Sequence, residues 1–152
     1  MNRFKADYQP QVLKNAKALA KGLAGAGIQV CGDPALGYTE THQVVVEVGY
    51  AKGIEAARAL EENNIICNYQ ALPLDEGFTA SSGLRLGVSE MTRFGMKEAD
   101  MATVAGLMAE VLLKGATVKD KAAQLRKDFL ELGYCFQDKD LDGLQEELLG
   151  SF

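Results

Sequence analysis

The sequence predicts an α+β fold, a two-layer arrangement in which a small, mostly antiparallel sheet carries helices packed on one face. Segments with helical and strand periodicity are mixed along the chain without a strict β-α-β repeat. Residues 41–48 show the clearest strand alternation, and residues 97–114 form a strongly amphipathic helical segment. The 152 residues, 47% of them hydrophobic, have the size and composition of one soluble domain with one sizeable core.

The first segment, residues 2–26, is predicted to be a long helix because its apolar residues fall at helical spacing. Gly25 and Gly27 are expected to end this helix. Pro10 is unfavourable inside a helix, so we expect the helix to begin near that residue. The apolar side chains that share one face are Val12, Ala16, Leu19 and Leu23.

The middle of the chain alternates between short elements. The patterns predict a strand at residues 28–31, a loop at 32–38, a strand at 41–48, a helix at 53–63 and a strand at 65–67. In the second of these strands one face carries three valines, Val44, Val46 and Val48. We expect the inward side chains of the helix to be Ile54, Ala57 and Leu60, or Ala56 and Leu60.

A long irregular segment, residues 68–81, leads into a short strand at residues 82–87. The helix at residues 97–114 follows, and Lys114 and Gly115 mark its end. Residues 117–120 resemble a capping box that opens another helix. One face of that helix is predicted to carry Val118, Ala122, Leu125, Phe129 and Leu132. A short amphipathic helix is also expected at residues 140–152.

Arg85 is the main candidate site residue. Leu84 and Leu86 alternate with it, so Arg85 points to the opposite face of its strand, with Gly83 and Gly87 leaving space around it. A guanidinium matches a carboxylate through two parallel hydrogen bonds, which favours a carboxylate-binding role. The residues alone leave two alternatives open, namely pairing with an internal Asp or Glu and a solvent-exposed strand arginine.

Other residue patterns exclude several classes of function. The net charge of -5 and the absence of basic runs disfavour nucleic acid and anionic membranes as partners. Cys31, Cys67 and Cys135 lack metal-ligand spacing, and three free thiols suit the cytoplasm. His42 is the only histidine and is expected to have a structural role. Neither a signal peptide nor a membrane-spanning segment is recognisable. No complete catalytic set can be named, so we assign no catalytic and no metal-ligating residue.

Four stretches of the sequence together resemble the C-terminal small domain of serine hydroxymethyltransferase, a pyridoxal-phosphate enzyme of fold type I. They occur in the order found in that family and cover roughly residues 4–115. The stretches are YQPQVLKNAKAL at residues 8–19, TETH followed by QVVVEV at 39–48, a segment at 60–75 that contains NYQ and then Pro and Asp, and SGLRLGVSEMTRFG at 82–95.

The resemblance implies a function for the parent enzyme, which interconverts serine and glycine and transfers a one-carbon unit to tetrahydrofolate. Arg85 matches the family arginine that binds the carboxylate of glycine or serine, and Gln70 stands where a family asparagine faces the folate. Residues 1–26 would form a linking helix from an absent N-terminal pyridoxal-phosphate domain, and residues 27–152 would form the small domain. No lysine here matches the cofactor lysine of the family, so this chain alone is expected neither to bind pyridoxal phosphate nor to turn over. The full enzyme is expected to be a homo-oligomer.

Several positions depart from the family pattern and leave alternatives open. Val88, Ser89 and Glu90 replace the family's TPA, Phe94 stands at a position that is often arginine, and the tail after Tyr134 differs. With Gln70, these changes make a pyridoxal-phosphate aldolase or transaldolase that does not use folate an alternative. A second alternative is a stand-alone interaction domain that keeps the fold without the chemistry. A third is an unrelated α+β domain.

Overall fold

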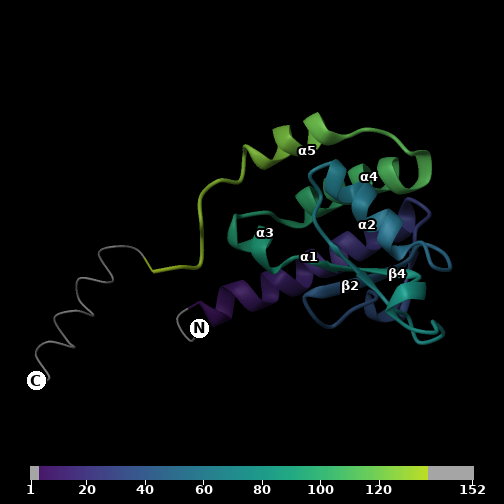
Figure 1. Ribbon diagram of the computed structural model, residues 1–152. Helices are drawn as coiled ribbons and strands as arrows, with labels where there is room; N and C mark the ends of the chain where they lie inside the picture. The colour runs from purple at the N-terminus through teal and green to yellow at the C-terminus, as the bar shows by residue number, and fades with distance from the viewer. Residues whose placement is uncertain (1–3, 137–152) are drawn as a thin grey trace, which may run out of the picture.

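The computed structural model of the protein describes residues 4–136. A four-stranded antiparallel sheet forms one layer of this structure (Figure 1). Its strands are β1 (Gln29–Val30), β2 (Gln43–Glu47), β3 (Asn68–Gln70) and β4 (Gly83–Gly87). They lie in the order β1-β2-β4-β3, and each neighbouring pair is antiparallel. The central pair is therefore formed by β2 and β4, which are not consecutive strands because α2 and β3 lie between them in the sequence.

Helices form the second layer. They are α1 (Lys5–Gly25), α2 (Gly53–Glu62), α3 (Ser89–Arg93), α4 (Glu98–Lys114) and α5 (Lys119–Arg126), with 3₁₀ turns at Pro34–Leu36 and Phe78–Ala80. Figure 1 shows the long purple α1 leading from the N-terminus to the sheet, and α5 at the outside of the molecule. Within residues 4–136, no helix is long and apolar enough to cross a membrane.

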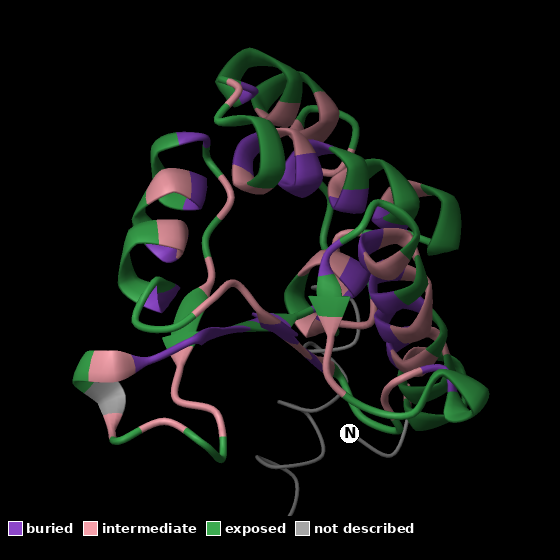
Figure 2. Ribbon diagram, turned by 90° about the vertical axis from the view of Figure 1, so that its right-hand side faces the viewer, coloured by how far each residue is buried: buried purple, intermediate pink, exposed green. Residues whose placement is uncertain are grey.

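The core lies between the two layers and confirms the predicted α+β arrangement. Val44 and Val46 of β2 and Leu84 and Leu86 of β4 are buried, whereas Arg85 is exposed on the opposite face. Figure 2 shows buried residues on the inward sides of the helices and along the strands, with exposed residues on the outer sides of the helices. One face of the sheet is therefore covered by helices, and within residues 4–136 no helix covers the face that carries Arg85, which we call the open face.

The two longest helices, α1 and α4, approach each other closely. A Cβ atom at Gly22 of α1 would lie 2.7 Å from Cβ of Ala105, which is itself fully buried on α4. Because atoms at that distance overlap, the absence of a side chain at Gly22 sets the spacing of the two helices. Leu19 and Leu23 of α1 and Met101 and Met108 of α4 fill the adjoining core, as the helical spacing predicted.

The structure corrects the predicted start of α1. The helix begins at Lys5 and continues through Pro10, although proline removes one backbone hydrogen bond. Pro10 is exposed, and so is Ala6, whose carbonyl would have accepted that bond. Solvent can therefore satisfy this carbonyl, and the apolar stripe that begins at Tyr8 packs despite the proline.

The third strand was predicted at residues 65–67 but lies at Asn68–Gln70. Ile66, which made the segment look like a strand, is 87% exposed. The observed strand is polar because it is the edge of the sheet and has little surface to bury. The apolar residues at 65–67 therefore predicted the wrong position for β3.

The region after α4 also differs from expectation. The helix predicted from residue 117 to about 132 is the shorter α5, no side chain caps its start, and Leu132 is exposed. The N–H of Val118 instead donates to Oδ1 of Asn63 at 2.6 Å, so a buried asparagine at the end of α2 replaces the predicted capping box. The helix expected at residues 140–152 lies outside the described residues.

Residues that follow α5 return to the start of α1. The Gly133 N–H donates to the Arg93 carbonyl at 2.6 Å, and the rings of Tyr8 and Tyr134 lie 5.1 Å apart. Phe94 is one of the departures from the family pattern. The guanidinium carbon Cζ of Arg126 lies over its ring, 4.1 Å from the ring centroid. A cation–π contact within the chain therefore occupies this position.

Candidate functional site

Arg85 lies at the centre of the open face of the sheet. It is paired across the sheet with Val45 of β2 on one side and with Asn68 of β3 on the other. Paired residues of antiparallel strands point to the same face, so these three side chains form one row. Among the described residues the Arg85 side chain has no hydrogen bond and no ion pair, which argues against pairing with an internal carboxylate.

A cavity of about 270 Å³ opens beside the Arg85 side chain. Its wall consists of residues from three strands and the segment before β3, namely Gln43, Ile66, Cys67, Asn68, Arg85 and Gly87. No acidic residue belongs to this wall, so the guanidinium is the charged group that a ligand would meet. A permanently charged planar donor in such a cavity is suited to a carboxylate.

The sequence did not indicate Gln43 or Asn68 as members of this site. Both are polar residues without a motif, and only the strand register brings them beside Arg85. The pairing of β2 with β4 places Gln43 opposite Gly87, two residues beyond Arg85. Neither neighbour could be found by spacing along the chain.

Gln70, the second predicted site residue, lies on β3 opposite Gly83. Its side-chain nitrogen donates to the carbonyl of Ala71 at 3.0 Å, and it does not line the Arg85 cavity. The structure therefore brings Gln70 to the same edge of the sheet as Asn68 without joining it to Arg85.

Asp75 organises the loop that leads into the Arg85 strand. Its carboxylate accepts hydrogen bonds from the Leu72 N–H at 2.7 Å, the Ser82 N–H at 2.7 Å and the Ser82 hydroxyl at 2.5 Å. The Ser82 hydroxyl is the main cause that holds the pKa of Asp75 below its usual value, and the two backbone N–H groups act in the same direction. Residues 72 and 82 are thus tied to one side chain.

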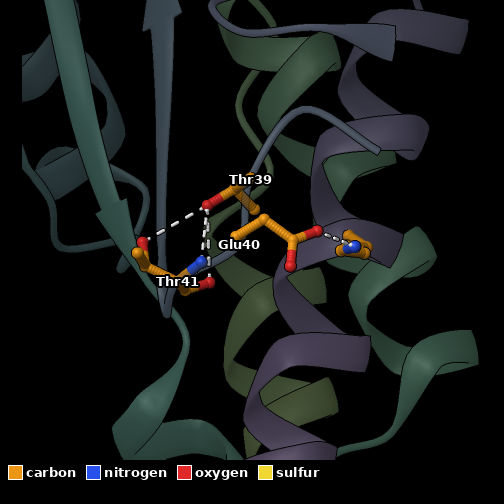
Figure 3. Close-up of polar contacts among 4 residues, drawn as sticks. Thr39, Glu40 and Thr41 are labelled. Atoms are coloured by element: carbon orange, nitrogen blue, oxygen red, sulfur yellow. Dashed lines mark hydrogen bonds and ion pairs between the residues drawn. The ribbon is translucent and has the colours of Figure 1, made fainter. Parts of the chain in front are cut away.

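The TETH stretch forms a turn that enters β2. Oγ1 of Thr39 accepts from the Thr41 N–H at 3.1 Å, and Oγ1 of Thr41 accepts from the Gln43 N–H at 3.2 Å. Glu40 pairs with Lys17 of α1, and Figure 3 draws a dashed line from the Glu40 carboxylate toward that helix. These contacts fasten the start of β2 to α1, so the stretch positions the strand that borders the Arg85 cavity.

His42 ends this turn and is exposed. Its carbonyl accepts the Val88 N–H at 3.2 Å, which extends the pairing of β2 with β4 beyond Gly87. Any residue could make this backbone contact, so the structural role expected of the His42 side chain stays a prediction. Among residues 4–136, no three His, Cys, Asp or Glu side chains come close enough together to hold a metal ion.

The cysteines are free thiols in the described part of the chain. Cys67 lines the Arg85 cavity, and burial, followed by the nearby charge of Glu61, raises its pKa to about 11. The thiol is therefore protonated at neutral pH and is a poor nucleophile there.

A larger cavity, of about 510 Å³, lies elsewhere, between the end of β2, α2 and the C-terminal part of α4. Ala56, Ala59 and Val111 contribute apolar surface to it, and Lys52 and Glu55 contribute charges of opposite sign. None of the residues that the sequence singled out for function lines it. We place the candidate site at Arg85, whose charged side chain has no partner in the part of the chain that the structure describes.

Comparison with known proteins identifies the family. The model of the serine hydroxymethyltransferase family matches residues 1–108 of the chain. The chain belongs to the serine hydroxymethyltransferase family. The resemblance noted in the four stretches is thereby confirmed.

Individual relatives agree with this assignment. The serine hydroxymethyltransferase of Sulfolobus acidocaldarius is 46% identical over 147 residues, which cover 93% of this chain and 34% of the relative. That of Pyrobaculum aerophilum is also 46% identical, over 146 residues with the same coverage. The chain thus spans about a third of the length of the serine hydroxymethyltransferases that it matches.

A solved structure shows the same fold. The L-threonine transaldolase of Pseudomonas fluorescens, solved in its internal aldimine state, superimposes with a TM-score of 0.80 and 31% sequence identity. The match covers 95% of this chain and 34% of the transaldolase. The α+β fold is therefore that of one domain of a fold type I pyridoxal-phosphate enzyme.

The residues that line the Arg85 cavity do not by themselves fit pyridoxal phosphate. The Arg85 cavity is lined by two amides, a thiol, an isoleucine and a glycine, and by no lysine that could bond to the cofactor aldehyde.

Proposed function

We propose that this chain is the small domain of a serine hydroxymethyltransferase-like enzyme and that Arg85 binds the carboxylate of the amino-acid substrate, glycine or serine. The observation that carries the proposal is the Arg85 guanidinium, which has no partner among residues 4–136 and lies in a cavity without an acidic residue. Family membership supports it, because Arg85 stands in the SGLRLG stretch that resembles the family's carboxylate-binding strand.

In this proposal the chain orients the amino-acid substrate in the active site. Two parallel hydrogen bonds from a guanidinium fix both the position and the plane of a carboxylate. Arg85 is held on a strand that is paired on both sides, so its backbone has little freedom to move. A substrate fixed in this way presents one face of its Cα to the rest of the active site, which lowers the entropic part of the reaction barrier.

Pyridoxal phosphate would supply the electron sink for the bonds at Cα, held by residues outside this chain. We further propose that residues 1–26 connect to the domain that holds the cofactor and that residues 27–152 form the small domain. The homo-oligomeric state and the cytoplasmic location expected for such an enzyme belong to the same proposal. Tetrahydrofolate is the proposed one-carbon acceptor, with Gln70 on the folate side.

The first experiment is to measure the mass of the natural gene product. The chain has 16.4 kDa and spans 34% of its serine hydroxymethyltransferase relatives, so an enzyme would be about three times larger. A native product of about 16 kDa would instead favour the stand-alone interaction domain.

The second experiment replaces Arg85 in that natural product. Arg85→Ala is expected to raise the dissociation constant for glycine by about 100-fold, because two hydrogen bonds to a charged group are lost. Arg58→Ala, an exposed arginine on α2, is the matched control and should leave glycine binding unchanged. Unchanged glycine affinity in Arg85→Ala would refute the assigned role.

The similarity to the L-threonine transaldolase favours a second candidate function, an aldol-type exchange that does not use folate. Both candidates need Arg85 for the amino-acid carboxylate, so the arginine variants do not separate them. Assaying serine cleavage with and without tetrahydrofolate does. Dependence on tetrahydrofolate supports the hydroxymethyltransferase, and turnover that requires an aldehyde acceptor instead supports the transaldolase.

A further inference from the structure

Asn68 occupies a defined position relative to Arg85. It is the first residue of the edge strand β3, and its Cα is the register partner of Arg85. Both side chains therefore project from the open face of the sheet, and both line the 270 Å³ cavity. On the opposite side Arg85 has Val45 as its neighbour, which cannot donate a hydrogen bond.

The amide of Asn68 is available for a ligand. Among the described residues it has no hydrogen-bond partner, in contrast to the buried Asn15 and Asn63, whose amides both donate and accept hydrogen bonds. Arg85 likewise has no partner, although the two side chains are neighbours. An arginine and an asparagine amide can both donate, so a ligand that accepts from both would be held between them.

We propose that Asn68 is a second substrate-contacting residue of the Arg85 site and donates its amide N–H to the carboxylate that Arg85 holds. This inference rests on the proposed carboxylate role of Arg85. A bidentate guanidinium uses one lone pair on each carboxylate oxygen, and each oxygen keeps a second lone pair for another donor.

The composition of the cavity also defines the class of ligand. Arg85 is its one charged lining residue, Gln43 and Asn68 are neutral, and Gly87 adds no side chain. One positive charge with neutral donors suits a singly charged carboxylate. A phosphate or a dicarboxylate would leave a negative charge without a partner in this cavity.

The test is an NMR titration of the 152-residue chain with sodium acetate, at constant ionic strength maintained with sodium chloride. The side-chain signals of Arg85 and Asn68 are expected to shift together and to give one dissociation constant. The side-chain amide of Gln29, exposed on the far edge strand β1, is the internal control and should not shift. Because Asn68 is exposed, its variants are expected to fold, which the same spectra report.

Two variants sharpen the test. Asn68→Ala should weaken acetate binding by about two- to tenfold, which corresponds to one hydrogen bond, while the Arg85 signal still responds. Asn68→Asp should abolish acetate binding at neutral pH, because the introduced carboxylate pairs with Arg85.

The outcomes separate the two proposals. An Arg85 shift with a silent Asn68, or full affinity in Asn68→Ala, overturns the role of Asn68 and leaves that of Arg85 standing. If neither side chain responds to acetate, the inference falls together with carboxylate binding at Arg85.

Discussion

The side-chain nitrogen of Asn15 lies 2.9 Å from Oγ1 of Thr92, and this hydrogen bond joins α1 to α3 in the interior of the protein. The same nitrogen donates to the Met96 carbonyl at 2.8 Å, and the Thr92 hydroxyl donates to the Val88 carbonyl at 2.7 Å. Val88 follows β4 directly, so this buried network fixes the segment that leaves the Arg85 strand.

Replacing Asn15 with alanine is therefore expected to lower the free energy of unfolding by about 2 kcal/mol, because the Met96 carbonyl loses its buried donor. Thr92→Val should cost about 1–2 kcal/mol, since the Asn15 amide then lacks an acceptor. The double variant should cost less than the sum of the single variants, because both act on one network. Urea denaturation of the four proteins measures these values.

Thr103→Val, at an exposed threonine on α4, is the control and should change the free energy of unfolding by less than about 0.5 kcal/mol. Additive effects of the Asn15 and Thr92 variants would show that the two side chains are not coupled.

The Asp75 carboxylate predicts a pH dependence. Its pKa in the folded protein is lowered from the usual 3.8, chiefly by the Ser82 hydroxyl and also by the Leu72 and Ser82 N–H groups. A lowered pKa means that the folded state binds its proton less tightly than the unfolded state does. Asp75 therefore stabilises the fold above the usual pKa, and this contribution disappears as the pH falls through the lowered pKa.

Asp75→Asn should thus be less stable than the unmodified chain at neutral pH, and the difference should shrink as the pH falls below about 4. Glu110, whose pKa is lowered by its bond to Lys121, is common to both proteins, so its effect cancels in the comparison. Urea midpoints measured across the acidic range give the difference. A difference that stays constant at all pH values would contradict the role of the Asp75 carboxylate.

Strong periodicity explains which elements could be predicted from the sequence. The spacing of apolar residues identified α1 and α4, and alternation identified β2 and β4, because in each the buried side chains set the pattern. The edge strand β3 was misplaced, since its residues are polar. The five-residue α3 was missed, because its buried side chain is a threonine, Thr92, held by Asn15 from 77 residues away.

In the candidate site, too, the sequence predicted one part and could not predict the other. Alternation with Leu84 and Leu86 was sufficient to place Arg85 on the face opposite the core. Asn68 and Arg85 are neighbours only through the register of β3 with β4, which depends on the loop that Asp75 holds. Sequence patterns within one element could therefore predict the central residue of the site, whereas its surroundings depend on contacts between elements.

Cys67 provides a prediction about reactivity. Burial, and then the charge of Glu61, raises its pKa from 9.0 to about 11, so at pH 8 the folded protein should contain about 100-fold less Cys67 thiolate than the unfolded chain. Alkylation by iodoacetamide, followed at each cysteine by mass spectrometry, should be slower by about that factor in the native protein than in urea. Glu61→Gln should raise the alkylation rate of Cys67 in the native protein, because it removes the negative charge that contributes to the raised pKa. Equal rates in the folded and unfolded protein would show that the thiol is neither buried nor perturbed.

Gly22 and Gly106 allow a matched comparison, because both are glycines within long helices. At Gly22 an added Cβ would lie 2.7 Å from Cβ of Ala105, whereas at Gly106 no neighbouring atom lies within 4 Å. Gly106→Ala should therefore raise the free energy of unfolding by about 0.5–1 kcal/mol, since alanine has the higher helix propensity and nothing opposes it. Gly22→Ala should lower it by about 1–3 kcal/mol, because α1 and α4 must move apart and the gain in propensity is smaller than the cost of overpacking.

The opposite signs of these two effects are the essential part of the prediction. Helix propensity alone predicts stabilisation at both positions, so only the close approach of α1 and α4 can reverse the sign at Gly22. A second variant tests this cause directly, since Ala105→Gly in the Gly22→Ala background removes the Cβ atom that Gly22→Ala would strike. That double variant should recover part of the lost stability, measured by urea denaturation. If Gly22→Ala were as stabilising as Gly106→Ala, the two helices would not be in the contact described.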